Sequence, residues 1–381
     1  MTTSNEFDDI RSYNDEEVQE VIDRLLQDSE FQQIISFIFP EQKKEDMAAW
    51  LRSFQSKHDF QHQLIKLLVC RITDKCVDSL ECTGFENIRQ NESYTFISNH
   101  RDIVMDAALL CLLLSREGYE TTEIAIGDNL LIRSWIKDLV RLNKSFIVKR
   151  GVGIRQMLEV SQHLSRYIHY TITQKKESIW IARREGRAKD SNDRTQESVL
   201  KMLTMSGGAD YRRTILDLNI VPLSLSYEYD PCDFLKAKEL QQRRDNPDFK
   251  KSPADDLENM QTGIFGYKGR IHFQFGQPIH SDLEKIAAEI PKTEWFSKVA
   301  SLIDREIFRN YLFFPINYIA YDRLEGGNRF SDRYTSEDAA RINSYFDKQL
   351  GKIDLPNKDI PFLTEKILEM YANPVRNQLN S

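Results

Sequence analysis

The stretch Phe96-Ile97-Ser98-Asn99-His100-Arg101-Asp102-Ile103-Val104-Met105-Asp106 joins the end of an apolar, strand-like run to the start of a helical one. Tyr94–Ser98 has the composition of a buried strand, and Val104–Leu114 is almost wholly apolar over the length of a short helix. In open α/β sheets, ligands bind beyond the carboxyl ends of the strands. The stretch therefore predicts a strand followed by a helix, with His100 where such sheets bind their ligands.

Strand-like and helical runs continue to alternate along the chain on the carboxyl side of this stretch. Further strand-like runs are Thr122–Ile126, Ser145–Lys149, Ser178–Ala182, Ile220–Ser226 and Gly269–Phe275. Strands that alternate with helical patterns are typical of βαβ units. We therefore expect an α/β fold with a mixed, largely parallel sheet flanked by helices.

Both ends of the chain show helical rather than strand-like periodicity. We predict a helical N-terminal segment at 1–80, an α/β domain at 81–280 and a helical C-terminal segment at 281–381. The charged, polar run Gln241–Asp255 is expected to be an exposed excursion from the α/β domain.

Composition excludes several classes of protein. The 381 residues carry a net charge of −7, so there is no overall basic field for nucleic acid, and any anion site must be a local patch. The 5 cysteines are scattered without a C-x-x-C pair, which predicts neither a disulfide framework nor a zinc site. The longest uncharged stretch, Asn310–Tyr321, has 12 residues, fewer than the roughly 18 that a membrane-spanning helix needs. With no signal-peptide pattern at the N-terminus, we expect a cytoplasmic protein.

A histidine at a strand end is well suited to act as a general base, because its pKa lies near neutrality. A nearby carboxylate would hold one ring nitrogen and leave the other free to take a proton. Asp106 and Asp102 are the candidates for that carboxylate. The alternative interpretation is that Asn99 and Asp102 cap the helix and that His100 is a surface residue.

Cations gather at two further strand ends. Lys149, Arg150 and Gly151 follow one strand, and the segment 183–194 after another contains Arg183, Arg184, Arg187, Lys189 and Arg194. Such groups suit a phosphate or a carboxylate, and Glu185 could orient an arginine or bind a substrate hydroxyl. Taken singly, each cluster is better explained as solvated surface charge. A fourth segment contains Pro222, which fits a strand only at its start or at a bulge.

In this order, the four segments resemble the glycerolipid acyltransferase family, which includes glycerol-3-phosphate and 1-acylglycerol-3-phosphate acyltransferases. The matching blocks are Asn99-His100 with Asp106, Phe146 to Arg150, Glu185-Gly186-Arg187 and Ile220-Val221-Pro222, within about residues 85–230. The family usually places its aspartate five positions after the histidine, where this chain has Met105. A bacterial subgroup with a His-Arg-Asp-Ile-Val-x-Asp block is more similar. We therefore predict Asp106 as the partner of His100, with Asp102 as the fallback.

The resemblance implies acyl transfer from acyl-CoA or acyl-ACP, as co-substrate, to a hydroxyl of glycerol 3-phosphate or a lysophospholipid. His100 would be the base, and Glu185 would hold an acceptor hydroxyl. The implied substrate-binding set is Lys149, Arg150, Glu185, Gly186, Arg187 and Pro222, with Arg183 and Arg184 as extra candidates. We expect no metal, no other cofactor, no nucleic acid partner, and peripheral contact with the inner face of the membrane as an option.

The acyl chain needs an apolar groove, for which the helical run after His100 offers Val104, Ala107, Ala108, Leu109, Leu110 and Leu112–Leu114. The aromatic segment Tyr311–Ile319 is expected to pack in the core, with docking on a membrane as the alternative. A non-catalytic lipid-binding member of the same fold is the alternative function. A hydrolase is disfavoured, because it needs a nucleophile and the chain has no G-x-S-x-G sequence.

Overall fold

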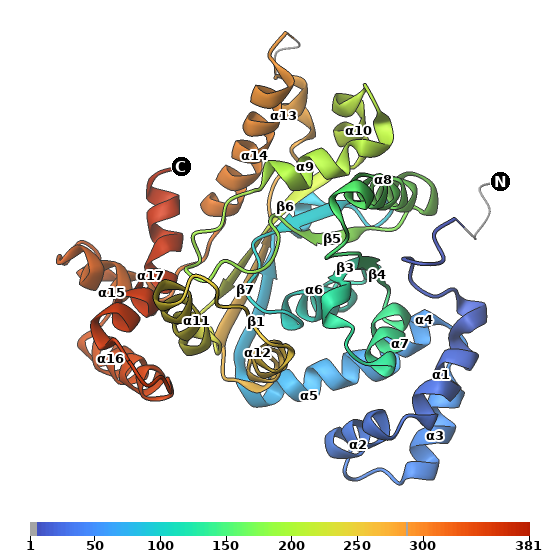
Figure 1. Ribbon diagram of the computed structural model, residues 1–381, viewed down its shortest axis with the longest axis horizontal. Coiled ribbons are helices and arrows are strands. Elements are labelled where there is room, and N and C mark those ends of the chain that lie inside the picture. The colour runs from blue at the N-terminus through green and yellow to red at the C-terminus, as the bar shows by residue number, and fades with distance from the viewer. Residues whose placement is uncertain (1–5, 287–288) are drawn as a thin grey trace.

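A computed structural model describes residues 6–286 and 289–381, so residues 1–5 of the predicted N-terminal segment lie outside it. Within them, a 7-stranded sheet has the order β1-β7-β6-β2-β5-β3-β4 (Figure 1). The strands are β1 (Val77–Thr83), β2 (Thr95–Ser98), β3 (Glu123–Gly127), β4 (Ser145–Val148), β5 (Ile179–Ala182), β6 (Ile220–Tyr227) and β7 (Gly269–Phe275). Neighbouring strands are parallel except for β6 and β7. The expected mixed, largely parallel sheet is confirmed.

Helices cover both faces of this sheet, because successive strand residues point to opposite sides. Phe96 belongs to the core under α6, and Ile97 belongs to the core under α8 and α14. Strands buried on both faces have continuous apolar runs, which is why they are readable in the sequence. The helices of this region are α5 (Lys66–Cys76), α6 (Met105–Arg116), α7 (Ser134–Leu142), α8 (Ile154–Tyr170), α9 (Glu197–Leu203), α10 (Tyr211–Asp217), α11 (Asp233–Asp245) and α12 (Pro253–Phe265).

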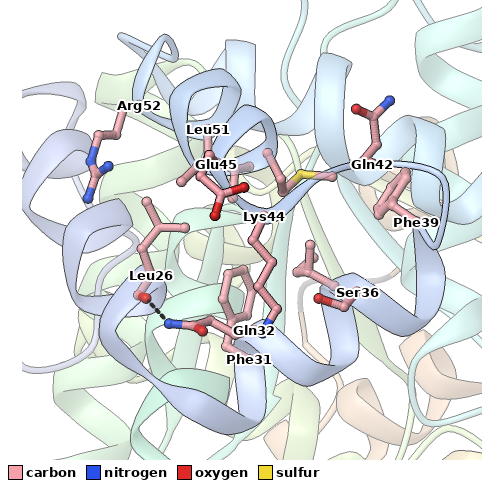
Figure 2. Close-up of a pocket in the computed structure, with 13 residues that line it drawn as sticks. Leu26, Phe31, Gln32, Ser36, Phe39, Gln42, Lys44, Glu45, Leu51 and Arg52 are labelled. Carbon is pink, nitrogen blue, oxygen red and sulfur yellow. Dashed lines mark hydrogen bonds between the residues drawn. The ribbon is translucent and has the colours of Figure 1, made fainter.

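The N-terminal helices form a layer of their own beside α7 (Figure 1). They are α1 (Val18–Gln27), α2 (Ser29–Ile38), α3 (Lys44–Arg52) and the short α4 (Lys57–Asp59). Phe31, Phe39 and Leu51 line a hollow of about 240 Å³ between them (Figure 2). At its edge the Gln32 amide donates to the carbonyl of Leu26 at 2.5 Å.

The C-terminal helices are α13 (His280–Glu284), α14 (Lys292–Arg309), α15 (Pro315–Glu325), α16 (Ser336–Gly351) and α17 (Ile360–Leu379). In Figure 1, α13 and α14 lie at the top, and α15, α16 and α17 lie at the left, across the sheet from the N-terminal helices at the lower right. In the aromatic segment, Tyr311, Phe314, Ile316 and Ile319 are buried, so its packing is that of a core. No helix in the described part of the chain combines the length and apolarity that crossing a bilayer requires.

One expectation from the sequence is wrong. β1 begins at Val77, inside the segment expected to be helical, and carries Asp78, Ser79 and Glu81 because it is an edge strand with its side chains partly in solvent. The run Gln241–Asp255 is exposed at most of its positions, as expected, and it is partly helical. It contains the end of α11 and the start of α12, which a Ser252–Asp255 capping box fixes.

Pro222 lies in a central strand, which the sequence allowed only at a strand start or bulge. Its carbonyl accepts from Gly276, just beyond the last residue of β7 that pairs with β6. The N–H and C=O of a strand residue point to the same side, so the missing proline N–H faces the place where β7 has ended. The missing N–H therefore falls at the end of the β6–β7 ladder, where Pro222 takes part through its carbonyl alone.

Candidate active site

His100 and Asp106 lie together where β2 gives way to α6. The Nδ1 atom of His100 is 2.8 Å from Oδ2 of Asp106. The same oxygen accepts from the backbone N–H groups of Arg101 at 2.6 Å and Asp102 at 3.1 Å, and Tyr227 donates to Oδ1 at 2.9 Å. Asp106 is fully buried, and these donors offset the cost of burying a carboxylate. Burial and the Asp106 charge raise the pKa of Tyr227 well above its usual value, so its hydroxyl stays a donor.

Asp102 has a different environment from Asp106. Its Oδ1 accepts from the backbone N–H groups of Val104 at 2.9 Å and Met105 at 2.8 Å, so it caps the start of α6. Burial, together with the neighbouring charge of Asp106, raises the pKa of Asp102. Its side chain is therefore committed to the helix start, whereas Asp106 reaches the histidine ring.

Asn99 does not cap the helix. Its amide nitrogen donates to the carbonyl of Leu225 at 2.9 Å, and its amide oxygen accepts from the N–H of Leu225 at 2.9 Å. Asn99 thus clips the end of β2 to β6 just before the histidine. Trp180, on the neighbouring strand β5, presents its ring to His100 with centroids 5.5 Å apart and donates to Ser98 at 2.9 Å.

The side chain of His100 is 15% exposed and lines a cleft of about 410 Å³. The apolar walls come from α6 (Val104, Ala107, Ala108), α7 (Ile136, Val140) and α8 (Met157, Val160, Leu164), with Met202 and Met260 completing them. The predicted groove residues are therefore divided. Val104, Ala107 and Ala108 face the cleft, whereas Leu109, Leu110 and Leu112–Leu114 are buried in the core on other sides of α6.

The cations after β4 lie at the cleft. Lys149 and Arg150 both line it, and Arg150 lies 3.7 Å from the exposed carboxylate of Glu185. Lys149 is ion-paired with Asp9, which also lies 3.0 Å from the ring of His163. Burial alone would raise the pKa of Asp9, but the hydrogen bonds from Lys149 and His163 hold it below its usual value. The N-terminal segment thus reaches the cleft, which the sequence did not indicate.

The cations after β5 are divided by the sharp turn at Gly186, where φ is +66°. Arg184, Glu185 and Gly186 line the cleft. Arg187 donates to Asn259 of α12 at 3.3 Å, and its Nη1 atom is buried without a hydrogen-bond partner among the described residues. Such a donor is available to a bound anion.

Arg183 is not placed as predicted. It is fully buried, and its guanidinium donates to Asp193 Oδ1 at 2.8 Å and to Asp304 at 3.2 Å. These carboxylates compensate its charge and tie the loop to α14, so Arg183 is a structural residue. Pro222 is also buried in the sheet and does not line the cleft. The burial of Arg183 and Pro222 argues against both as substrate-binding residues.

The sequence did not point to Trp180, Tyr227 or Asn259 as residues of the site. Trp180 and Tyr227 lie in apolar strands where an aromatic residue is most simply explained by packing. Asn259 comes from α12, whose pattern is that of an ordinary capped helix. Only the register of β6 beside β2 brings Tyr227 to Asp106.

Comparison with known proteins bears directly on this region. The family model described as Acyltransferase matches residues 79–226, from β1 to β6. Among solved structures, a match is the 1-acyl-sn-glycerophosphate (LPA) acyltransferase PlsC from Thermotoga maritima, with 11% identity, coverage of 75% of this chain and 92% of that chain, and a TM-score of 0.36. Comparison with curated protein sequences gives no match. The family match supports the expectation of an acyltransferase, and it covers residues 79–226 of the 381-residue chain.

Proposed function

We propose that the protein transfers an acyl group from a thioester, acyl-CoA or acyl-ACP, to a hydroxyl of glycerol 3-phosphate or of a lysophospholipid such as 1-acylglycerol 3-phosphate. One observation carries the proposal: the His100–Asp106 pair lies in the wall of an apolar cleft whose lining also includes Lys149, Arg150 and Arg184. This combines a base, room for an acyl chain and charge for a phosphate. The volume of about 410 Å³ lies within the usual range for ligand sites, roughly 300–1,000 Å³.

In the proposed reaction, Nε2 of His100 takes the proton of the acceptor hydroxyl as its oxygen attacks the thioester carbonyl. Nδ1 is already engaged by Asp106, which fixes the ring and stabilises the imidazolium. When the C–S bond breaks, the proton passes from the imidazolium to the departing thiolate, and the new C–O ester bond remains. General base catalysis of this kind contributes about 10²–10⁴-fold.

The acyl chain would lie against α6, α7 and α8, the phosphate of the acceptor would meet Arg187, and the donor would enter past Lys149 and Arg150 of the open loop after β4. Glu185, with its side chain 74% exposed, is available to an acceptor hydroxyl. A guanidinium fork suits phosphate oxygens, and holding the phosphate aims the hydroxyl at the thioester. Because donor chain and acceptor are amphiphilic, we also propose that the protein works in peripheral contact with the inner face of a membrane.

The test is a panel assay with purified full-length protein. Acyl-CoA and acyl-ACP are each combined with glycerol 3-phosphate, 1-acylglycerol 3-phosphate and unphosphorylated glycerol, and both thiol release and the acylated product are measured. Acceptor-dependent thiol release with a phosphorylated acceptor is the expected result. Lipid binding without thiol release would instead support a non-catalytic lipid-binding protein.

The same assay addresses hydrolysis. Within residues 6–286 and 289–381, no hydroxyl or thiol hydrogen-bonds to the ring of His100, so a histidine-activated nucleophile is missing there. We therefore expect thiol release to depend on the acceptor. Release at an unchanged rate without any acceptor would mean that water is the substrate and would contradict the proposal.

A further inference from the structure

Helix α12 lies beyond the matched segment 79–226, between β6 and β7, yet it contacts the site through three residues within little more than one turn. Asn259 accepts from Arg187 at 3.3 Å, Met260 lines the cleft, and Gly263 packs against Asp102. One helix therefore touches the anion-binding arginine, the apolar cleft and the cap of the helix that carries Asp106.

Gly263 sets how closely α12 approaches. A Cβ atom at this position would lie 2.1 Å from Oδ2 of Asp102, which no side chain tolerates without displacement. The glycine lets the α12 backbone rest directly on the buried start of α6. The position of α12 relative to the His100–Asp106 pair is thereby fixed by packing.

The orientation of the Asn259 amide follows from its second contact. Its Nδ2 donates to the backbone carbonyl of Asp255 at 2.8 Å, one turn earlier, so its Oδ1 faces Arg187. Asn259 is 5% exposed, and its backbone carbonyl accepts from the thiol of Cys232 at 3.3 Å. The side chain is therefore oriented by its bond to Asp255, and its Oδ1 offers Arg187 a neutral acceptor.

A neutral acceptor has a consequence for Arg187. The amide holds Nη2 and adds no further negative charge beside a guanidinium that already interacts with the buried carboxylates of Asp102 and Asp230, and Nη1 is left buried without a hydrogen-bond partner among the described residues. A carboxylate in the same place would satisfy the arginine and compete with an incoming anion. The amide keeps the arginine oriented and still able to bind a phosphate.

We propose that Asn259 is a positioning residue for the phosphorylated acceptor: it holds Nη2 of Arg187 so that Nη1 meets the acceptor phosphate. The inference rests on the proposed function for the identity of the acceptor. Because Met260 follows in the cleft wall, α12 also sets the distance between the phosphate site and the acyl chain. Residues outside the matched segment thus take part in choosing the acceptor.

The experiment measures binding and turnover separately. Calorimetry with glycerol 3-phosphate and 1-acylglycerol 3-phosphate gives Kd for the full-length wild type, Asn259→Ala, Asn259→Asp and Arg187→Ala, and the transfer assay gives KM and kcat for both substrates. Asn377→Ala is the matched control. Asn377 is also a buried helical asparagine that accepts from an arginine of the same loop, Arg194, at 2.9 Å, but Arg194, unlike Arg187, is not one of the proposed substrate-binding residues.

We expect Asn259→Ala to raise the acceptor Kd and KM about 5–10-fold, and Asn259→Asp to raise them further, towards the effect of Arg187→Ala, at roughly 10–150-fold. The donor KM and the kcat at saturating acceptor should change less than about two-fold, because Asn259 does not touch the reacting atoms. Asn377→Ala should bind both acceptors as the wild type does. Should Asn259→Ala lose its fold, Asn259→Asp, which keeps size and acceptor, carries the test.

The two proposals can fail separately. Transfer by the wild type together with unchanged acceptor binding in Asn259→Asp would overturn the role of Asn259 alone. The expected order of Kd values without any acyl transfer would overturn the proposed function and leave the phosphate site standing. Equal losses of binding in Asn259→Ala and Asn377→Ala would show a general loosening of the loop and overturn the positioning role.

Discussion

The loop after β5 and the loop after β4 both bring cations to one cleft, but they are held in different ways. The β5 loop is tied at several points to helices far away in the sequence. Arg183 is buried between Asp193 and Asp304, Lys189 pairs with Glu239 at 2.8 Å, and Arg194 donates to Asn377 at 2.9 Å. The cations of this loop therefore sit in one geometry.

The β4 loop, in contrast, is held mainly by interactions between exposed side chains. Gly151 has φ of +68°, and open space surrounds the Cβ positions of Gly151 and Gly153. Lys149 is paired with Asp9, whose side chain is 45% exposed. A rigid set of cations suits a small phosphate held at a fixed distance, whereas an open loop suits the entry of a bulky thioester. We expect the β5 loop to serve the acceptor and the β4 loop to serve the donor.

The largest effect is expected at His100, which lines the cleft to which both loops contribute. His100→Ala should lower the rate of acyl transfer by about 10²–10⁴-fold, because the acceptor hydroxyl loses its base. The melting temperature should change little, since the ring is partly exposed and lies after the strand end. His280→Ala, which removes a half-exposed histidine of α13, is the control and should keep the wild-type rate. A folded His100→Ala variant with more than about a tenth of the wild-type rate would remove His100 from the base role.

Arg183→Ala tests the anchoring of the β5 loop. It leaves the buried carboxylates of Asp193 and Asp304 without their cation, so the free energy of unfolding should fall by about 3–5 kcal/mol. The neighbouring Arg184→Ala should cost less than about 1 kcal/mol and act on substrate binding instead. Denaturant titration of both variants measures the difference. Equal stability of the two variants would mean that Arg183 does not anchor the β5 loop.

A pair of aspartate variants tests which carboxylate at the start of α6 is the partner of His100. Asp106→Asn keeps size but removes the charge beside His100, so the rate should fall by about 10²-fold or more with little loss of stability. Asp102→Asn should mainly weaken the helix cap, by about 0.5–2 kcal/mol, and change the rate only a few-fold. Rates and melting temperatures are measured together. If Asp102→Asn is inactive and Asp106→Asn is active, the partner of His100 has been assigned wrongly.

The smallest effect is expected where the N-terminal segment meets the β4 loop. Asp9→Asn frees Lys149 and should cost less than about 1 kcal/mol, because the pair is largely exposed. The pKa of Asp9 is lowered in the folded state, so its stabilising contribution is present above the ordinary value of 3.8 and is lost as the pH falls through the folded value. Kinetics with acyl-CoA should show a change of about two- to five-fold in donor KM, with the acceptor KM unchanged. A change in acceptor KM alone would reverse the assignment of the two loops.

Much of the fold was predictable, because strands buried on both faces must be apolar throughout and are separated by helices with their own periodicity. The same local rules found the strand ends at which His100, Lys149 and Arg184 lie. They failed for β1, whose edge position allows Asp78 and Glu81 and so removes the pattern. A local pattern reports burial, and an edge strand is only partly buried.

The sequence by itself determined the strand–helix order and the presence of a histidine, carboxylates and cations at successive strand ends. Only the tertiary structure decided which of them meet. Arg183 and Arg184 are adjacent and alike, yet Arg183 turns inward to Asp304, 121 residues away, and Arg184 lines the cleft. Asn259 reaches Arg187 from a helix 72 residues further along the chain. Contacts between residues so far apart in the sequence depend on how the helices pack on the sheet, and that packing is set by the whole core. They therefore cannot be predicted from the residues that neighbour a side chain in the sequence.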